Sequence, residues 1–257
     1  MNKYTLITGG TEGIGLELAK LFAKDKHNLV IVARNEVKLQ EVKKQIENVY
    51  KIKVEIVSID FSVDKSCEKL FEFVDEKNII VDNLINNAGI GSFGEFYKSE
   101  EGFEDKIINI NIIALTKITK YYFKKMVNQG EGRIMNVAST AAFVSGPKMS
   151  LYYSTKAYVL SLTEALYEEG KKYGIKVSCL CPGPVKTKFQ EKSGIKKSES
   201  AKKCLMDPYE VARIAYYDFN KGKCIIIPGI KNKLLVIANK FAPRSITRKI
   251  VALTNKE

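Results

Sequence analysis

The 257-residue chain is predicted to be an α/β protein with one doubly wound, parallel, seven-stranded sheet in a single domain, followed by a C-terminal helical tail. Three observations predict this fold. Short runs rich in Val and Ile alternate with longer amphipathic stretches, as in parallel strands that are buried on both faces. The first run leads directly into spaced glycines and a helix. The composition, 45% hydrophobic and 28% charged, is that of a globular chain.

Each strand is expected where apolar or β-branched residues form a short run, beginning with YTLIT and NLVIVA. The strands are expected over residues 4–8, 28–33, 54–59, 81–85, 133–138, 175–181 and 224–227. Each helix is expected where the apolar residues recur at helical spacing, as Leu16, Ala19 and Phe22 do. The helices are expected over residues 14–26, 37–50, 62–77, 100–128, 151–173 and 208–220. Right-handed crossovers between these strands give a Rossmann-like sheet.

Two segments follow from this order: a dinucleotide-binding and catalytic domain over residues 1–230, and a basic amphipathic extension over 231–257. Pro243 is expected to break the extension into two helical pieces.

Several classes of function are excluded or disfavoured by composition. A single histidine, His27, excludes a serine–histidine relay. The five cysteines form no CxxC pair, so we expect a reducing compartment, no disulfide framework and no metal site. No uncharged apolar run reaches 18 residues and no signal peptide is recognised, so the protein is expected to be cytoplasmic.

A glycine-rich turn, TGGTEGIG at residues 8–15, joins the first strand to the first helix. Glycine permits a tight turn, and the helix N-terminus offers free N–H groups to a pyrophosphate. We therefore expect a dinucleotide to contact Gly9, Thr11, Gly13, Ile14 and Gly15, although a purely structural turn is the simpler alternative.

The residues after the second strand indicate which dinucleotide binds. An NAD site has a carboxylate here, which accepts hydrogen bonds from the ribose hydroxyls. This chain instead has Ala33 followed by Arg34, whose guanidinium suits a 2′-phosphate. We therefore predict NADP(H), with Glu12 and Glu36 as the two acids that count against it. Asp60, after the third strand, is expected beside the adenine, although a helix cap explains it equally well.

A YxxxK pattern occurs four times, and only its context separates one copy. Tyr152 and Lys156 follow Ser139 by 13 and 17 positions and precede Pro182-Gly183, so they lie where the carboxyl ends of strands open onto a ligand crevice. A phenol with a pKa near 10 is a poor acid–base catalyst at neutral pH. We expect the Lys156 ammonium, one helical turn away, to lower that pKa, and Ser139 to hydrogen-bond the substrate oxygen.

Together these motifs resemble the single-domain short-chain dehydrogenases/reductases, with NNAG at 86–89, Asn111 and NVAS ending at Ser139 in matching order. The resemblance covers residues 4 to about 230, and the tail resembles that of a subgroup with a basic C-terminal helix. It implies that Lys156 also holds the nicotinamide ribose and that Asn111 fixes a water beside Lys156. It also implies cofactor contacts from two further segments: Asn87, Ala88 and Gly89, and Pro182, Gly183, Val185 and Thr187.

The expected substrate is an apolar ketone, aldehyde or secondary alcohol. Its pocket is predicted from Ser92, Phe93, residues 141–149 and a lid over 185–206, with Phe143, Val144, Met149, Phe189 and Leu205 as apolar lining. An NADPH-dependent oxidoreductase is the leading interpretation. A 3-oxoacyl thioester reductase, a hydroxysteroid dehydrogenase, and an NADP(H)-sensing or scaffold protein on the same fold stay open.

Most of the net charge of +13 lies in two segments of the chain. Residues 186–203 hold seven lysines against two glutamates, and residues 231–257 hold seven cations against one. The lid could therefore attract an anionic carrier. The tail could contact an anionic membrane surface peripherally, or pack on its own domain or a second subunit. A homodimer or homotetramer is expected, and no nucleic-acid partner, because the charge lacks stacking aromatics.

Overall fold

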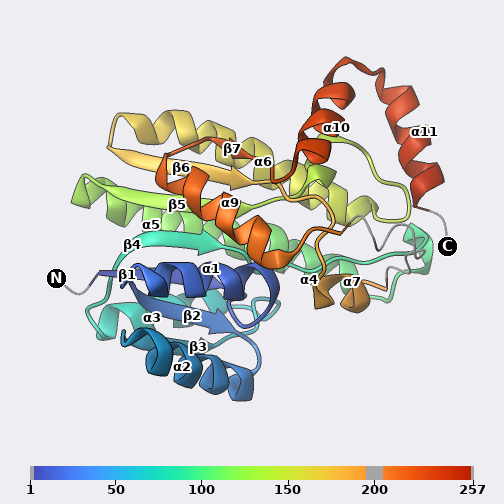
Figure 1. Cartoon of the computed structure of the whole chain (residues 1–257). Coiled ribbons are helices and arrows are strands. Elements are labelled where there is room, and N and C mark those ends of the chain that lie inside the picture. The colour runs from blue at the N-terminus through green and yellow to red at the C-terminus, as the bar shows by residue number, and fades with distance from the viewer. Residues whose placement is uncertain (1–2, 195–204, 256–257) are drawn as a thin grey trace.

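The computed structural model describes residues 3–194 and 205–255. Seven strands form one parallel sheet, as predicted, and their order is β3-β2-β1-β4-β5-β6-β7 (Figure 1). They are β1 (Lys3–Thr8), β2 (Asn28–Ala33), β3 (Val54–Ser58), β4 (Ile80–Asn86), β5 (Gly132–Val137), β6 (Ile175–Leu180) and β7 (Ile225–Ile226).

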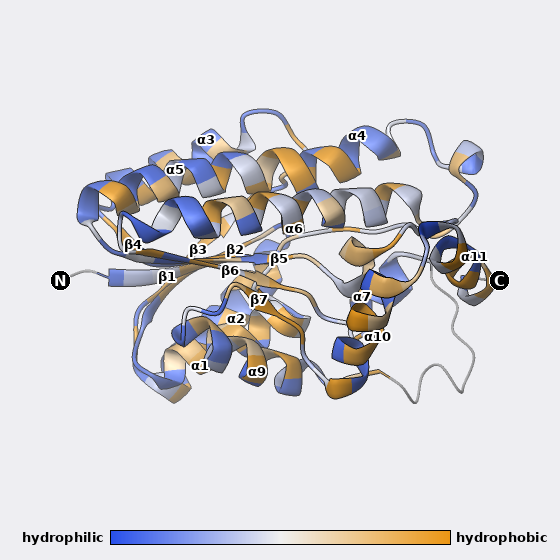
Figure 2. Cartoon of the chain, turned by 90° about the horizontal axis from the view of Figure 1, so that it is seen from above, coloured by the Kyte–Doolittle hydropathy of each residue, from blue (hydrophilic) through white to orange (hydrophobic). Residues whose placement is uncertain are grey.

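Helices cover both faces of the sheet (Figure 2). One face carries α1 (Gly13–Lys24), α2 (Glu36–Tyr50) and α9 (Pro208–Asn220). The other carries α3 (Ser66–Glu76), α4 (Phe103–Ile108), α5 (Leu115–Gln129) and α6 (Ser150–Lys171). Because side chains alternate along a strand, Leu6 packs into the core under α3 and α5, whereas its neighbour Ile7 packs into the core under α1.

Most predicted boundaries agree to within a few residues, and two regions differ. The helix expected over 100–128 is interrupted by a π-helical turn, Asn109–Ala114, between α4 and α5. The helix expected from 62 begins only at Ser66, since Asp60 accepts hydrogen bonds from the backbone N–H and the hydroxyl of Ser62 and turns the chain there.

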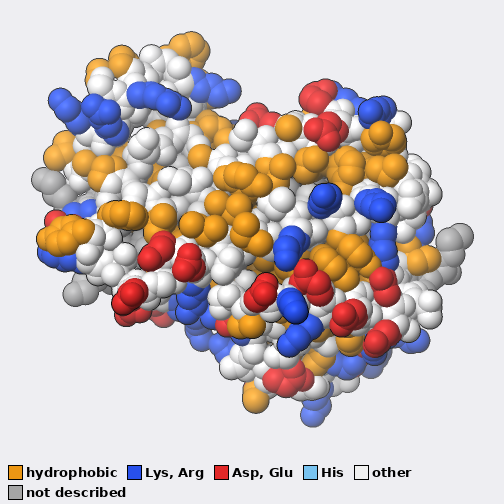
Figure 3. Space-filling model, turned by 180° about the vertical axis from the view of Figure 1, so that it is seen from behind, with side chains coloured by type: hydrophobic (Ala, Val, Ile, Leu, Met, Phe, Trp, Pro, Cys, Tyr) orange, Lys and Arg blue, Asp and Glu red, His pale blue; other side chains and the backbone are white. Residues whose placement is uncertain are grey.

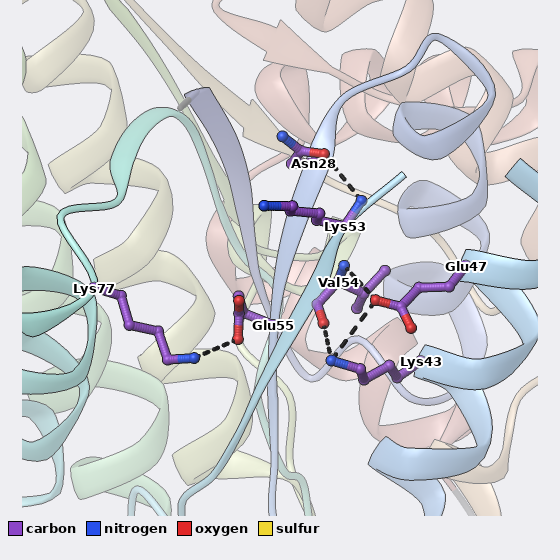
Figure 4. A network of polar contacts seen from close by, with 7 residues as sticks. All are labelled: Asn28, Lys43, Glu47, Lys53, Val54, Glu55 and Lys77. Carbon is purple, nitrogen blue, oxygen red and sulfur yellow. Dashed lines mark hydrogen bonds and ion pairs between the residues drawn. The ribbon is translucent and has the colours of Figure 1, made fainter. Parts of the chain in front are cut away.

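The outer edge of β3 is protected by polar side chains of α2 (Figure 4). Glu47 accepts a hydrogen bond from the N–H of Val54 at 3.0 Å, and the Lys43 ammonium donates to its carbonyl at 2.7 Å. Unpaired backbone groups on an edge strand invite pairing with another chain. These contacts remove that template at Val54.

The carboxyl ends of the central strands lie at one edge of the sheet. Thr8 of β1 is in register with Asn86 of β4, and Asn86 with Asn136 of β5. The loops that carry the predicted site residues therefore meet at this edge, where α7 (Lys188–Lys192) also lies.

The C-terminal tail forms two helices, α10 (Ile230–Phe241) and α11 (Arg244–Thr254), separated at Pro243 as predicted. The start of α10 packs on the domain, because Asn232 lies against Gly183 and donates to the carbonyl of Pro228. Over residues 3–194 and 205–255, no helix is both long enough and apolar enough to cross a bilayer.

Candidate active site

A cavity of about 610 Å³ opens at the carboxyl edge of the sheet. Sixteen of the predicted site residues line it: Gly9, Thr11, Gly13, Ile14, Arg34, Asp60, Asn87, Ala88, Gly89, Ser139, Tyr152, Lys156, Pro182, Gly183, Val185 and Thr187. Gly15 and Asn111 do not line it and lie behind its wall. The fold therefore brings residues from distant segments of the chain together around this cavity.

The glycine turn leaves a bare backbone along one wall of this cavity. Gly9 and Gly13 have φ of +67° and +58°, the left-handed region that favours glycine. A Cβ on Gly15 would lie 2.3 Å from the carbonyl oxygen of Gly9, so only glycine permits the helix to start this close to the turn. The Asn87 side chain donates to the carbonyls of Thr8 and Gly9, which ties the turn to the end of β4.

Three side chains at the end of β2 and the start of α2 line the next part of the cavity: Arg34, Asn35 and Lys38. Arg34 is half exposed, and its Nη1 lies 3.8 Å from Asp60 Oδ2. This is a loose pair that leaves the guanidinium available to another anion. Two cations therefore stand where the second strand ends, without a carboxylate at Ala33.

The two acids that counted against NADP(H) both have polar partners, although Glu12 lines the cavity. Glu12 forms ion pairs with Lys192 of α7 and with Lys38, whose Nζ is 3.6 Å away. Burial alone would raise the pKa of Glu12, but the two lysines outweigh it and the pKa is lowered. The Glu36 carboxylate accepts a hydrogen bond from Gln40 and does not line the cavity.

Asp60 lines the cavity, as a residue beside the adenine would. The helix-cap alternative is wrong, because α3 begins at Ser66 and Asp60 instead accepts hydrogen bonds from Ser62 in the turn after β3. Burial would raise its pKa, but the two hydrogen bonds from Ser62 and the charge of Arg34 lower it. The carboxylate therefore stays ionised.

Tyr152 lies in the first turn of α6, with its ring 5.5 Å from that of Phe189. Burial raises the pKa of the phenol to about 12, although a hydrogen bond with the Ser139 side chain acts in the opposite direction. The predicted lowering of this pKa is therefore wrong for the chain by itself, because desolvation outweighs the neighbouring groups.

Lys156 follows one helical turn later, and its Nζ is 5.7 Å from the centroid of the Tyr152 ring. The side chain is only 5% exposed, and its ammonium donates to the carbonyl of Val137 at 2.8 Å. Burial lowers the pKa of Lys156 to about 8. The sheet thus holds the cation at its carboxyl edge, beside the phenol.

Ser139 and Asn111 hold the surrounding backbone. The Ser139 hydroxyl accepts from the N–H of Ala141 and donates to the carbonyl of Pro182 at 3.3 Å. Asn111, in the π-helical turn, accepts from the N–H of Ile90 and donates to its carbonyl and to Thr155. A Cβ on Gly89 would lie 3.3 Å from Asn111 Oδ1 and 3.4 Å from Lys156 Nζ, so this glycine separates the two side chains.

The predicted apolar lining is only partly correct. Ala141, Met149 and Phe189 line the cavity, but Ser92, Phe93, Phe143, Val144 and Leu205 do not. Phe143 packs instead against the small core cluster around Val159. Part of the predicted lid, residues 195–204, with four of its seven lysines, lies outside the described residues.

Several lining residues were missed by the sequence analysis. Lys38 had a detectable signal, since it stands four positions after Arg34 at the start of a helix. Asn255 had none, because nothing in the sequence links the end of the tail to the first turn of α6. Tyr153 also lines the cavity, although no lysine follows it four positions later.

Comparison with known proteins assigns the family. Residues 3–198 match the model of the short chain dehydrogenase family. A Very-long-chain 3-oxoacyl-CoA reductase of Rattus norvegicus is 31% identical over 74% of this chain, which spans 61% of that relative's length. A 7beta-hydroxysteroid dehydrogenase of Mediterraneibacter gnavus is 29% identical over 91% of this chain and 89% of its own length.

A solved structure agrees with these matches. The short-chain dehydrogenase from Sphingobium yanoikuyae, in complex with NADPH, superposes with a TM-score of 0.84 at 28% identity and covers 93% of this chain and 94% of its own. The chain therefore belongs to the short chain dehydrogenase family.

Proposed function

We propose that the protein is an NADPH-dependent reductase of apolar ketones or aldehydes. The observation that carries this proposal is the meeting of Tyr152, Lys156 and Ser139 in the cavity that the glycine turn also lines. The bound dinucleotide would supply the hydride. The S. yanoikuyae relative, which was solved with NADPH, supports the same cofactor.

The residues present fit a dinucleotide with a 2′-phosphate. The bare backbone at Gly9 and Gly13 leaves room for the pyrophosphate beside the N-terminus of α1. Arg34 and Lys38 would hold the 2′-phosphate, since both are cations that line the cavity where β2 ends, and their ion pairs with Asp60 and Glu12 are long, at 3.8 and 3.6 Å. Lys156 and the segment from Pro182 to Thr187 would hold the nicotinamide end.

Tyr152 keeps its proton at neutral pH, although its raised pKa makes it a weak acid whose phenolate needs stabilisation. A phenol with a pKa of about 12 is protonated at neutral pH, which is the form that can give a proton to a developing alkoxide. The Lys156 cation would then stabilise the phenolate that is left, and Ser139 would hydrogen-bond the substrate oxygen. We assign Asn111 as a positioning residue, because it links Ile90 to Thr155, whose hydroxyl donates to the Tyr152 carbonyl.

The substrate class rests on the apolar side chains at the Tyr152 end of the cavity. Met149 and Phe189 favour an extended apolar carbonyl compound, and the relatives named for 3-oxoacyl-CoA and hydroxysteroid substrates are consistent with this. Lys188 and Lys192 line the cavity, and Lys186 lies between the lining residues Val185 and Thr187. These lysines would suit an acyl thioester on an anionic carrier, which is the second candidate.

The test is NADPH and NADH oxidation against a panel of apolar ketones, an acyl thioester and a polar sugar ketone. We expect turnover of apolar ketones with preference for NADPH, and a loss of about 100-fold or more in Tyr152→Phe. Tyr158→Phe is the matched control, since Tyr158 lies on the same helix, is exposed and bonds Thr116 outside the cavity. Equal activity of Tyr152→Phe would remove it as the proton donor, whereas binding of NADPH without turnover of any carbonyl would favour a sensor.

We further propose that residues 1–230 form the catalytic domain and that the tail over 231–257 makes a peripheral contact with anionic lipid. The described part of the tail carries six cations and no acid, beside exposed apolar residues. A cytoplasmic protein that assembles as a homodimer or homotetramer remains our prediction.

A further inference from the structure

The end of the tail returns to the catalytic cavity. Asn255, directly after α11, lines the cavity together with Tyr153, the neighbour of the proposed proton donor. Its Nδ2 donates to the carbonyl of Pro147 at 3.0 Å, a contact across 108 positions of the sequence. The end of the tail is thus a part of the cavity wall, while the hairpin of α10 and α11 projects beside the sheet (Figure 1).

Tyr153 and Asn255 also contact each other. A side-chain hydrogen bond from Asn255 lowers the pKa of Tyr153, against the larger raising effect of burial. A hydrogen bond that lowers the pKa of a phenol is one donated to its oxygen. The hydroxyl proton of Tyr153 is therefore left as a donor, and the carboxamide of Asn255 adds an acceptor oxygen.

The surroundings hold this polar pair in place. The Tyr153 ring lies on Gly146, where an added Cβ would come within 2.5 Å of ring carbons. Tyr152 and Tyr153 meet edge to face with centroids 6.2 Å apart, and the remaining nearby lining includes Met149. A polar pair beside apolar side chains discriminates strongly between substrates that can and cannot satisfy it.

We propose that Tyr153 and Asn255 form a second polar subsite, which binds an oxygen substituent of an extended apolar ketone while Tyr152 and Ser139 bind the carbonyl. This inference rests on the proposed reductase function and narrows its substrate class to apolar ketones with a second oxygen. It also makes the C-terminal tail a determinant of substrate specificity.

The test compares the full-length protein with Tyr153→Phe and Asn255→Ala on a set of tetracyclic ketones. Members of the set carry a hydroxyl at different ring positions, and the deoxy ketone is the reference. For at least one hydroxyl position, we expect the parent to prefer the hydroxylated ketone about tenfold in kcat/KM. Tyr153→Phe should abolish that preference and leave kcat/KM for the deoxy ketone within about twofold.

Controls separate this role from a structural one. Tyr158→Phe and Thr254→Ala should keep the preference, since Tyr158 bonds Thr116 and Thr254 bonds its own helix at Val251. The melting temperature and the Kd for NADPH of each variant report whether it folds. An unchanged preference in folded Tyr153→Phe and Asn255→Ala, or no preference in the parent, overturns the subsite alone. No turnover of any ketone by the parent overturns the proposed function and the subsite with it.

Discussion

At the scale of single residues, Lys156 is the most unusual group in the structure. It is 5% exposed, and its Nζ donates a hydrogen bond to the neutral carbonyl of Val137. A buried ammonium without a carboxylate is costly, and this cost is expressed as a pKa lowered to about 8. The buried Lys156 side chain therefore lowers the stability of the fold. This is the pattern expected where a side chain has a role in catalysis.

This cost predicts a pH dependence of stability. The pKa of Lys156 falls from 10.5 in the unfolded chain to about 8 in the folded one, so between these values the unfolded chain binds more protons. The free energy of unfolding must then rise with pH over this window. We expect Lys156→Met to be more stable than the parent at pH 7.5, with the difference shrinking by about 2 kcal/mol at pH 9.5.

Urea unfolding of both proteins at the two pH values measures this difference. Subtracting the free energy of unfolding of the variant from that of the parent cancels the contributions of the tyrosines and cysteines that titrate in the same range. A difference that is constant or grows with pH would show that Lys156 is not desolvated as described.

The residue scale also shows what the sequence could predict. Spacing and context placed Ser139, Tyr152 and Lys156 at one cavity, because residues at the carboxyl ends of parallel strands must meet. Burial could not be predicted, and it decides the direction of both pKa shifts. Phe93 and Phe143 look like pocket residues by type, but Phe143 packs in a core cluster and the Phe93 ring lies 5.9 Å from the Lys148 ammonium.

At the scale of elements, the glycine turn and the end of β4 form one unit. Asn87 donates to two carbonyls of the turn, and Gly15 stands against one of them. The sequence predicted the turn and the strand separately. Their contact required the sheet order, which places β1 beside β4.

A methyl group at Gly15 should therefore disturb the proposed pyrophosphate site. In Gly15→Ala the new carbon would lie 2.3 Å from the Gly9 carbonyl oxygen and 2.5 Å from Asn87 Nδ2, so the turn must shift. We expect the Kd for NADPH, measured by fluorescence titration, to rise about tenfold or more.

Gly130→Ala is the control for this variant. Gly130 has a φ of +73° and open space around its Cα, so the substitution costs about 1 kcal/mol of backbone strain without touching the turn. Its Kd for NADPH should match that of the parent. A Gly15→Ala protein that binds NADPH as the parent does would place the pyrophosphate elsewhere.

The π-helical turn between α4 and α5 was not predicted from the sequence. The sequence of Asn109–Ala114 continues the apolar pattern of the helices on either side, so a single helix was the natural prediction. The wider turn lets Asn111 bond both backbone groups of Ile90 while it reaches Thr155. Such turns recur at functional sites, in agreement with a positioning role.

At the scale of the whole molecule, the tail hairpin is largely exposed: among its described helical residues, only Val236 and Thr247 are buried. Figure 3 shows it projecting from the body, with cations and apolar side chains next to one another. Its exposed apolar residues are Ile230, Leu234, Leu235, Ile237, Phe241, Ile246, Ile250 and Leu253. An isologous dimer through this face would oppose cations to cations, which favours an anionic lipid surface.

Liposome co-sedimentation tests this contact. We expect the protein to bind vesicles that contain phosphatidylserine and to bind phosphatidylcholine vesicles weakly, with loss of binding at high salt. Phe241→Asp should weaken binding, because Phe241 is 85% exposed at the turn of the hairpin. Tyr97→Asp changes an aromatic residue that is 78% exposed outside the tail and should bind as the parent does. If the parent and both variants bind equally, or if none of them binds, the tail does not contact lipid as proposed, and a protein partner is then favoured.

The central claim is that this cavity transfers a hydride from NADPH to a carbonyl carbon and a proton from Tyr152 to its oxygen. The most direct measurement is mass spectrometry of the alcohol formed from an apolar ketone and NADPH deuterated at the transferring position. The account predicts one deuterium on the carbinol carbon with the parent protein, and at most about 1% as much alcohol with Tyr152→Phe. Alcohol without the label, or labelled alcohol formed equally fast by the variant, would contradict it.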